Sequence, residues 1–252
     1  MKYFISAPFG NYIKRPEKAV SVTGTWTVRS RSGLSKQILK TLRYVKTDGH
    51  WGWRNKLGLR NAGINVGLSR TDISNEVCSI AAIEKTDWVT LFDIIPPWAN
   101  IEVNISCPNL HSNEDTTRFD GFERFTKIEN KYCNEEYWGD KKLREWMICK
   151  IPPTSSENLI DQIVHSGFDQ IHASNTLPSK KGGLSGKVLI PHTLRIVKYI
   201  KTKYPHVTII AGGGVTEPSD VDRYLNAGAS HISLGSVCFR PWKLKKLLAY
   251  QK

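Results

Sequence analysis

Short apolar segments alternate along the chain with longer amphipathic ones, and most of the apolar segments end at Gly, Pro or a polar cluster. Short runs rich in Val and Ile and closed by a turn residue are typical of strands buried in a parallel sheet. We therefore predict eight strands, at residues 2–7, 19–23, 77–83, 101–105, 145–151, 170–173, 207–211 and 230–234.

Apolar residues at helical spacing predict helices between most of these strands. The clearest lie at residues 86–94, 119–132, 191–203 and 241–250, with one more after a cap at Ser155 or Ser156 and one after a cap at Thr216. Alternation of this kind favours a parallel α/β fold, and 252 residues is an ordinary length for a (β/α)8 TIM barrel. We expect residues 1–252 to form one barrel domain.

The alternation is interrupted between about residues 25 and 75. This excursion is rich in Gly, Arg, Lys, Trp and Asn, and its pattern predicts a single strand, at residues 40–45. Long segments without regular structure are uncommon in compact domains and are often functional lids or walls. We expect one or the other here.

The chain is strongly basic, with 36 Lys and Arg against 23 Asp and Glu, a net charge of +13. Such a surplus suits nucleic acid, an anionic surface, or anionic substrates and phosphate-bearing cofactors. It does not choose among them, because runs such as residues 243–246 are most simply solvated helix faces.

Cysteine and apolar content indicate a cytoplasmic protein. The five cysteines are widely spaced, with no C-x-x-C pair, which argues against a disulfide framework and against a zinc or iron–sulfur site. No apolar run approaches the roughly 18 residues of a membrane span.

Residues 101–109, Ile-Glu-Val-Asn-Ile-Ser-Cys-Pro-Asn, carry the strongest candidate chemistry. The apolar alternation stops at Pro108, so the Cys107 thiol lies where a strand ends. Asn104 and Asn109 flank it, and each amide offers an acceptor and two donors to a planar, amide-rich ligand. An isolated cysteine is more often an inert buried residue, so the flanking residues carry the functional interpretation.

Glycine-bearing loops follow the last two predicted strands, at Gly212-Gly213-Gly214 and at Gly235-Ser236. Bare backbone N–H groups near a helix start are what a barrel phosphate site requires. A further glycine-rich loop, residues 180–186, has a bare backbone that could approach a ligand closely.

Four more polar residues are candidates. Lys150 lies near the end of an otherwise apolar strand, where a lysine is seldom fully buried unless its charge is used. Asn175 and Thr176 follow the next strand, and Asn55 begins a segment rich in Gly and Asn that by itself would indicate only a turn.

The segment Val-Asn-Ile-Ser-Cys-Pro-Asn resembles the active-site segment of the dihydroorotate dehydrogenase family, flavin-dependent (β/α)8 barrels, and its cysteine resembles the soluble branch. Further segments resemble the family in the same order. The resemblance implies FMN as cofactor and oxidation of dihydroorotate to orotate in pyrimidine biosynthesis, with Cys107 as the base that takes the proton. It also implies site residues: Asn55, Asn104, Asn109, Asn175 and Thr176 for the pyrimidine, Gly213, Gly214, Gly235 and Ser236 for the FMN phosphate, Gly186 near the ribityl chain, and Lys150 beside the flavin ring.

A lysine of that family is missing. The soluble branch has it at the end of the second strand, where this chain has Gly24, and the membrane-bound branch has it just after the first strand, where this chain reads Phe9-Gly10-Asn11. Lys14, three residues further on, is the nearest lysine, but we do not expect it to take that place. Loss of that cation would remove a charge-assisted contact worth roughly 1.5–3 kcal/mol.

Three functions stay open at this point. The first is a dehydrogenase acting on dihydroorotate or another pyrimidine. The second is a flavoenzyme acting on uracil in RNA, as dihydrouridine synthases do, which the positive charge suits, although that family has Gly-Cys-Pro in place of Ser-Cys-Pro. The third is a barrel that binds FMN or a nucleotide without turnover, which Gly24 and Gly10 favour. We expect a small-molecule pyrimidine rather than nucleic acid, no membrane partner, and by resemblance a homodimer.

Overall fold

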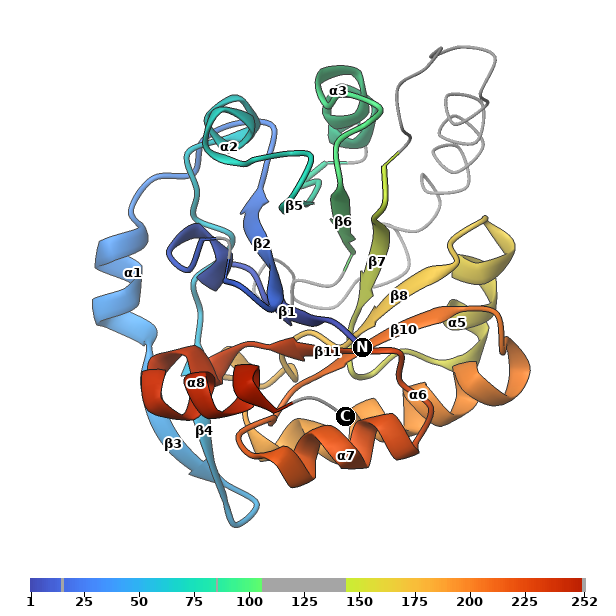
Figure 1. The fold of residues 1–252 in the computed structure, drawn as a ribbon. Helices are drawn as coiled ribbons and strands as arrows, with labels where there is room; N and C mark the ends of the chain where they lie inside the picture. The colour runs from blue at the N-terminus through green and yellow to red at the C-terminus, as the bar shows by residue number, and fades with distance from the viewer. Residues whose placement is uncertain (15, 85, 106–143, 251–252) are drawn as a thin grey trace.

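The computed structural model describes residues 1–14, 16–84, 86–105 and 144–250. Eight parallel strands close into a barrel in the order β1-β11-β10-β8-β7-β6-β5-β2 (Figure 1). They are β1 (Tyr3–Ile5), β2 (Ala19–Trp26), β5 (Val77–Ile80), β6 (Ile101–Asn104), β7 (Met147–Ile151), β8 (Gln170–Ala173), β10 (Thr208–Gly212) and β11 (His231–Leu234). The predicted (β/α)8 fold is confirmed.

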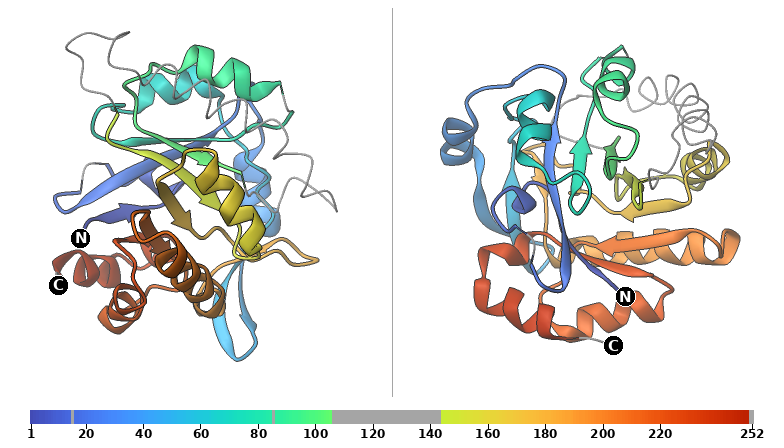
Figure 2. Two further views of the ribbon diagram at one scale, coloured as in Figure 1. Left: turned by 90° about the vertical axis from the view of Figure 1, so that its right-hand side faces the viewer. Right: turned by 45° about the horizontal axis from the view of Figure 1, so that its top comes forward.

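Helices cover the outside of the barrel (Figure 2). They are α2 (Ile64–Arg70), α3 (Asp87–Ile94), α5 (Glu157–His165), α6 (Ile190–Lys203), α7 (Pro218–Asn226) and α8 (Pro241–Ala249). Their buried faces are mostly apolar: α5 buries Ile160 and Ile163, and α3 buries Trp88 and Leu91. None of the helices in the described ranges is long and apolar enough to cross a membrane. The helix predicted at residues 119–132 lies outside the described residues.

One predicted helix cap is confirmed and one is wrong. Ser156 caps α5, and its hydroxyl accepts a hydrogen bond from the Leu159 N–H at 3.2 Å. The cap of α7 is Glu217 rather than Thr216, because Pro218 in the first turn keeps the residue before it extended (φ −154°, ψ 161°). Thr216 bonds the Asp220 carboxylate instead, through its N–H at 3.0 Å and its hydroxyl at 3.1 Å.

The strand predicted at residues 40–45 is confirmed in part, because a strand is present but covers residues 43–47. That part of the chain contains the end of a helix, α1 (Leu34–Thr41), and the start of an antiparallel hairpin made by β3 (Arg43–Thr47) and β4 (His50–Asn55). Asp48 and Gly49 form the turn, both in the left-handed region with φ of 48° and 79°. Asp-Gly is a strong sequence signal for a two-residue hairpin turn, and it marks the true boundary.

The hairpin is joined to a distant part of the chain. Residues Gly183–Leu184 (β9) pair with β4, which gives a second sheet in the order β3-β4-β9. The two backbones come so close that a Cβ added at Gly52 would lie 1.9 Å from the Ser185 carbonyl oxygen. Glycines of the 180–186 loop are needed for the same reason, because a Cβ at Gly182 would lie 2.2 Å from the Asn55 carbonyl oxygen and one at Gly186 2.9 Å from the Gly52 Cα.

The interior of the barrel changes character along its axis. Toward the amino ends of the strands it is filled by an apolar cluster, Phe4, Val22, Val77, Trp146, Ile148 and Ile210. Because side chains alternate along a strand, the next inward residue lies two positions on. Ser79 follows Val77 and Lys150 follows Ile148, so a polar layer lies above the apolar one, nearer the carboxyl ends of the strands.

Candidate active site

A cavity of about 950 Å³ opens at the carboxyl ends of the barrel strands. Lys150 and His172 of the polar layer lie on its inner surface, and apolar residues of the excursion, such as Leu34, Ile38 and Leu57, form one side. The excursion is therefore a wall of this cavity.

The cavity collects all of the predicted site residues that the structure describes. They are Asn55, Asn104, Lys150, Asn175, Thr176, Gly186, Gly213, Gly214, Gly235 and Ser236. Cys107 and Asn109 lie outside the described residues, so their predicted roles stay predictions. Most of the ten come from the ends of barrel strands, which is where enzymes of this fold carry their chemistry.

Two asparagine side chains from neighbouring parts of the barrel are hydrogen-bonded across the cavity floor. The Asn175 amide donates to Asn104 Oδ1 at 3.2 Å, and the Asn104 amide donates to the Thr25 hydroxyl at 3.1 Å. The Thr25 hydroxyl in turn lies 3.0 Å from the Ser79 hydroxyl. This chain of contacts fixes the orientation of both amides before a ligand binds.

The glycine loops after β10 and β11 lie side by side, because these two strands are paired. Gly213 and Gly214 adopt φ of 98° and 77°, and a Cβ at Gly213 would come within 2.8 Å of Leu189. The Tyr224 hydroxyl holds the loop by donating to the Gly213 carbonyl at 2.7 Å. At Gly235, by contrast, the nearest atom to an added Cβ is 3.9 Å away, in the Ser6 side chain, so no neighbour crowds the backbone there. The arrangement can cradle a phosphate.

A buried charge cluster lies beneath the cavity. Glu102 is fully buried, and its Oε1 accepts from the Ser79 hydroxyl at 2.8 Å and lies 3.4 Å from the Lys150 ammonium. Its Oε2 lies 2.6 Å from His172 Nδ1. Sequence reasoning found Lys150 but missed Glu102 and His172, although both show the same signal, a charged or titratable residue within an apolar strand.

The protonation states in the cluster follow from burial and from the neighbouring charges. Burial raises the pKa of Glu102, but Lys150 and His172 outweigh it and lower the pKa to about 2. Burial, together with the Lys150 charge, lowers the pKa of His172, against the opposing effect of Glu102. At neutral pH Glu102 is therefore a carboxylate and His172 a neutral imidazole.

The place of the missing family lysine is occupied by backbone contacts. Gly24 has φ of 94°, and a Cβ there would lie 2.4 Å from the Ser79 carbonyl oxygen. The Asn11 side chain clamps the same residue, accepting from the Gly24 N–H at 2.9 Å and donating to its carbonyl at 3.3 Å. Neither position presents a cation.

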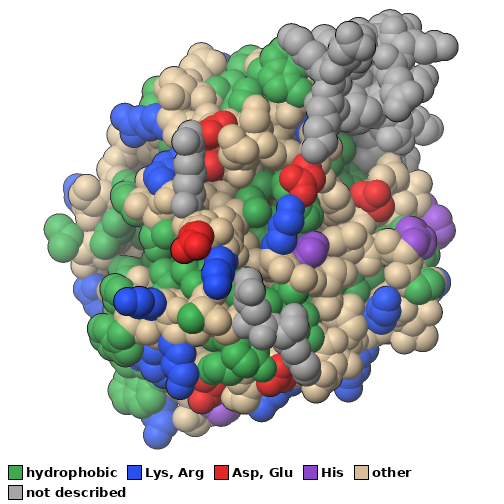
Figure 3. Space-filling view, viewed as in Figure 1, with side chains coloured by type: hydrophobic (Ala, Val, Ile, Leu, Met, Phe, Trp, Pro, Cys, Tyr) green, Lys and Arg blue, Asp and Glu red, His purple; other side chains and the backbone are tan. Residues whose placement is uncertain are grey.

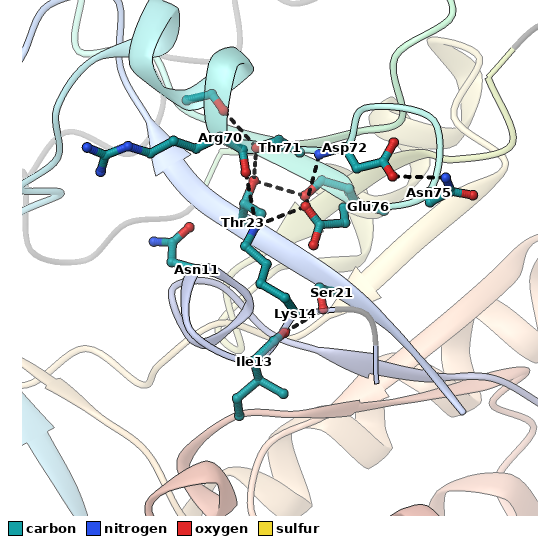
Figure 4. Close-up of polar contacts among 12 residues, drawn as sticks. Asn11, Ile13, Lys14, Ser21, Thr23, Arg70, Thr71, Asp72, Asn75 and Glu76 are labelled. Atoms are coloured by element: carbon teal, nitrogen blue, oxygen red, sulfur yellow. Dashed lines mark hydrogen bonds and ion pairs between the residues drawn. The ribbon is translucent and has the colours of Figure 1, made fainter. Parts of the chain in front are cut away.

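Lys14 lines the cavity, but its ammonium is already paired (Figure 4). It donates to Glu76 Oε2 at 2.9 Å and to the Arg70 carbonyl at 3.1 Å. The Glu76 side chain is only 3% exposed, so Lys14 neutralises a buried carboxylate. This geometry argues against Lys14 as a replacement for the missing lysine.

The positive charge of the chain is not gathered on the face shown in Figure 3. Lys and Arg side chains are scattered there among hydrophobic and uncharged surface, with Asp and Glu between them. A strand of nucleic acid is usually bound by a continuous basic stripe, which this face lacks among its described residues.

Comparison with known proteins agrees with the family resemblance of the sequence. The family model for dihydroorotate dehydrogenase matches residues 11–248. The dihydroorotate dehydrogenase B (NAD(+)) catalytic subunit of Petrotoga mobilis is 29% identical over 248 residues, covering 84% of this chain and 74% of that protein. The protein of the same name from Thermotoga maritima is 26% identical over 209 residues, covering 74% and 72%.

A solved structure shows the same fold. The crystal structure of DHODH from Eimeria tenella in complex with ferulenol matches with a TM-score of 0.73 at 16% sequence identity, covering 98% of this chain and 79% of that one. The family model spans nearly all of the barrel. The chain belongs to the dihydroorotate dehydrogenase family of flavin-dependent oxidoreductases.

Proposed function

We propose that this protein is an FMN-dependent dehydrogenase that oxidises dihydroorotate to orotate, a step of pyrimidine biosynthesis. The observation that carries the proposal is the cavity at the carboxyl ends of the strands, where residues as distant in sequence as Asn55 and Ser236 meet. Asn55 was expected there from the family resemblance, and Ser236 was expected there also from the glycine-bearing loop that follows the last strand.

The residues present fit FMN. The bare backbone at Gly213, Gly214, Gly235 and Ser236 would hold its phosphate, Gly186 would lie by its ribityl chain, and Lys150 would contact its ring. When bound, FMN supplies the hydride acceptor that no amino-acid side chain provides.

The pyrimidine would be held by the amides of Asn104 and Asn175, with Asn55, Asn109 and Thr176 beside them. Cys107 would take the proton from the carbon next to the carbonyl, while the adjoining carbon loses a hydride and a C=C bond forms. Cys107 is three residues beyond Asn104, which lines the cavity, and three residues span at most about 11 Å. A thiol with an ordinary pKa of about 8.5 is mostly protonated at pH 7, so turnover should rise with pH.

An anaerobic absorbance spectrum of the purified protein, taken before and after adding dihydroorotate, tests the proposal. A flavin spectrum that bleaches supports both cofactor and reaction. Cys107→Ser should slow bleaching about 10²- to 10⁴-fold, the usual contribution of general base catalysis.

Cys238→Ser is the matched control. Cys238 also lines the cavity, but burial raises the pKa of its thiol to about 12, so it is no thiolate at neutral pH. A yellow protein that does not bleach with dihydroorotate would contradict the substrate, and a colourless one that cannot be reconstituted would contradict FMN.

A dihydropyrimidine without a carboxylate is the second candidate substrate. It is favoured by the absence of a side chain at Gly24 and by the pairing of Lys14 with Glu76. The same spectrum recorded with dihydrouracil separates the two: faster bleaching than with dihydroorotate would favour the neutral substrate. A homodimer stays a prediction from the resemblance, which gel filtration tests, and a cytoplasmic location stays a prediction from the cysteine pattern.

A further inference from the structure

His172 lines the cavity and lies beside Lys150 in the sheet. It lies on β8, in register with Lys150 on the neighbouring strand β7. It is 2% exposed, yet it lines the cavity. The family resemblance gives a role to Lys150 but none to His172 or to Glu102.

The contact with Glu102 fixes which imidazole nitrogen carries the hydrogen. The Glu102 carboxylate can only accept hydrogen bonds, and His172 Nδ1 lies 2.6 Å from its Oε2. A neutral His172 must therefore carry its hydrogen on Nδ1. Nε2 is left with a lone pair, so it is a hydrogen-bond acceptor.

That acceptor is open to the cavity. No side chain in the described part of the structure donates to Nε2. Among the described residues, every inaccessible side-chain N or O atom has a hydrogen-bond partner except Glu76 Oε1. Because His172 Nε2 has no such partner, it must keep some accessibility, and we assign that accessibility to the cavity that His172 lines. The Lys150 ammonium pairs with the same carboxylate, and Lys150 is in register with His172 on the neighbouring strand and also lines the cavity, so it adds a hydrogen-bond donor to the same part of the cavity wall.

We propose that Lys150 and His172, positioned by Glu102, form a donor–acceptor pair that recognises the imide edge of a ring, in which a carbonyl adjoins an N–H group. Both the flavin ring of FMN and the pyrimidine carry such an edge. The inference rests on the proposed function, because it concerns the ligands of the same cavity. The competing explanation is that His172 only completes the bonding of a buried carboxylate.

Methylated ligands distinguish these explanations. A methyl group on the imide nitrogen removes the hydrogen that Nε2 would accept. Wild type should bind 3-methyl-FMN about tenfold more weakly than FMN, or 3-methylorotate about tenfold more weakly than orotate, as expected for a lost bond that leaves a polar group unsatisfied. If methylation weakens FMN binding more than orotate binding, the flavin is the ring that the two residues recognise; if it weakens orotate binding more, the pyrimidine is. Both affinities can be measured by fluorescence, without turnover.

His172→Asn separates the two roles of the imidazole. The Asn amide nitrogen can donate to Glu102 from near the position of Nδ1, but it offers no acceptor where Nε2 lay. In this variant, the affinities for the unmethylated and the methylated ligand should differ by no more than about twofold. His172→Gln, which can place an amide oxygen near the position of Nε2, should restore part of the difference. The inference would be overturned if wild type binds FMN and orotate but binds their methylated forms equally well. That result would leave the proposed function unchanged.

The tautomer has its own test. Nitrogen-15 NMR of wild type should show a protonated Nδ1 and an unprotonated Nε2 for His172. In Glu102→Gln, whose amide can donate to Nδ1, the hydrogen should move to Nε2 and the preference for the unmethylated ligand should be lost. A wild-type His172 protonated on Nε2 would contradict the inference whatever the ligand does. Binding of neither FMN nor orotate would overturn the proposed function and the inference together.

Discussion

Glu102→Gln measures how much the buried charge cluster contributes to stability. The Glu102 carboxylate is fully buried and is bonded by Ser79, Lys150 and His172. Although burial raises its pKa, Lys150 and His172 bring the pKa down from an ordinary 4.5 to about 2. Because the folded pKa is the lower one, the ionised carboxylate stabilises the fold above pH 4.5 or so, and this contribution disappears as the pH falls toward 2.

The size of the effect follows from the same two values. The interval from 4.5 to about 2 corresponds to roughly 3 kcal/mol at about 1.36 kcal/mol per pKa unit. Removing one partner of a buried ion pair independently suggests about 3–5 kcal/mol. We expect Glu102→Gln to lose about 3 kcal/mol of unfolding free energy at pH 7, and its difference from wild type to shrink between pH 4.5 and pH 2.

Urea unfolding followed by tryptophan fluorescence gives this free energy, in the absence of FMN because a bound ligand would add its own stabilisation. Glu145→Gln is the matched control. Glu145 also pairs with a lysine, Lys2 at 2.5 Å, but both side chains are 48% exposed, so its loss should cost less than about 1 kcal/mol. A Glu102→Gln variant as stable as the Glu145→Gln control, or a loss that does not change with pH, would refute the reasoning.

Three further predictions concern the cavity and its surroundings. Lys14→Met should cost about 3 kcal/mol in urea unfolding, because it leaves the Glu76 carboxylate buried without a cation, and should leave FMN affinity within about twofold; a large loss of affinity with normal stability would instead place Lys14 at the ligand. Gly24→Ala should lower the melting temperature, since its Cβ would lie 2.4 Å from a carbonyl oxygen, and unchanged melting would contradict the backbone conformation described. Gly235→Ala, with the nearest atom 3.9 Å away, should melt normally but bind FMN more weakly in a fluorescence titration, and normal binding would place the phosphate elsewhere.

Most of the barrel could be predicted from sequence because its strands are short and apolar and most are followed by Gly, Pro or a polar cluster. Strand β8 agrees with the prediction at both ends, and the other barrel strands begin within about two residues of the predicted positions. Local pattern was misleading around residue 40, where good helix formers run directly into a β-branched segment. The Asp48-Gly49 turn is the local signal that resolves this region.

The features of the site also fall into two groups, those that the sequence reveals and those that only the folded structure reveals. Backbone features such as the Gly213 and Gly214 loop are visible in sequence because glycine itself is the signal. The partners of Lys150 are not visible, because Glu102 and His172 come from two other strands, and only the closed barrel brings the three side chains together. The pairing of Lys14 with Glu76, 62 positions away, is hidden for the same reason.

The sheet β3-β4-β9 gives the cavity wall a mechanical property. The excursion is held not only at its two ends but also at a third point, where Ser185 bonds the Trp53 carbonyl through its N–H at 2.8 Å and its hydroxyl at 3.1 Å across 132 positions of sequence. A segment pinned in this way cannot swing outward as a hinged flap without first breaking backbone hydrogen bonds. A displacement of the hairpin would also displace Gly186, which lies against Gly52 of β4. The rigidity of this side of the cavity therefore depends on two segments that are far apart in the sequence.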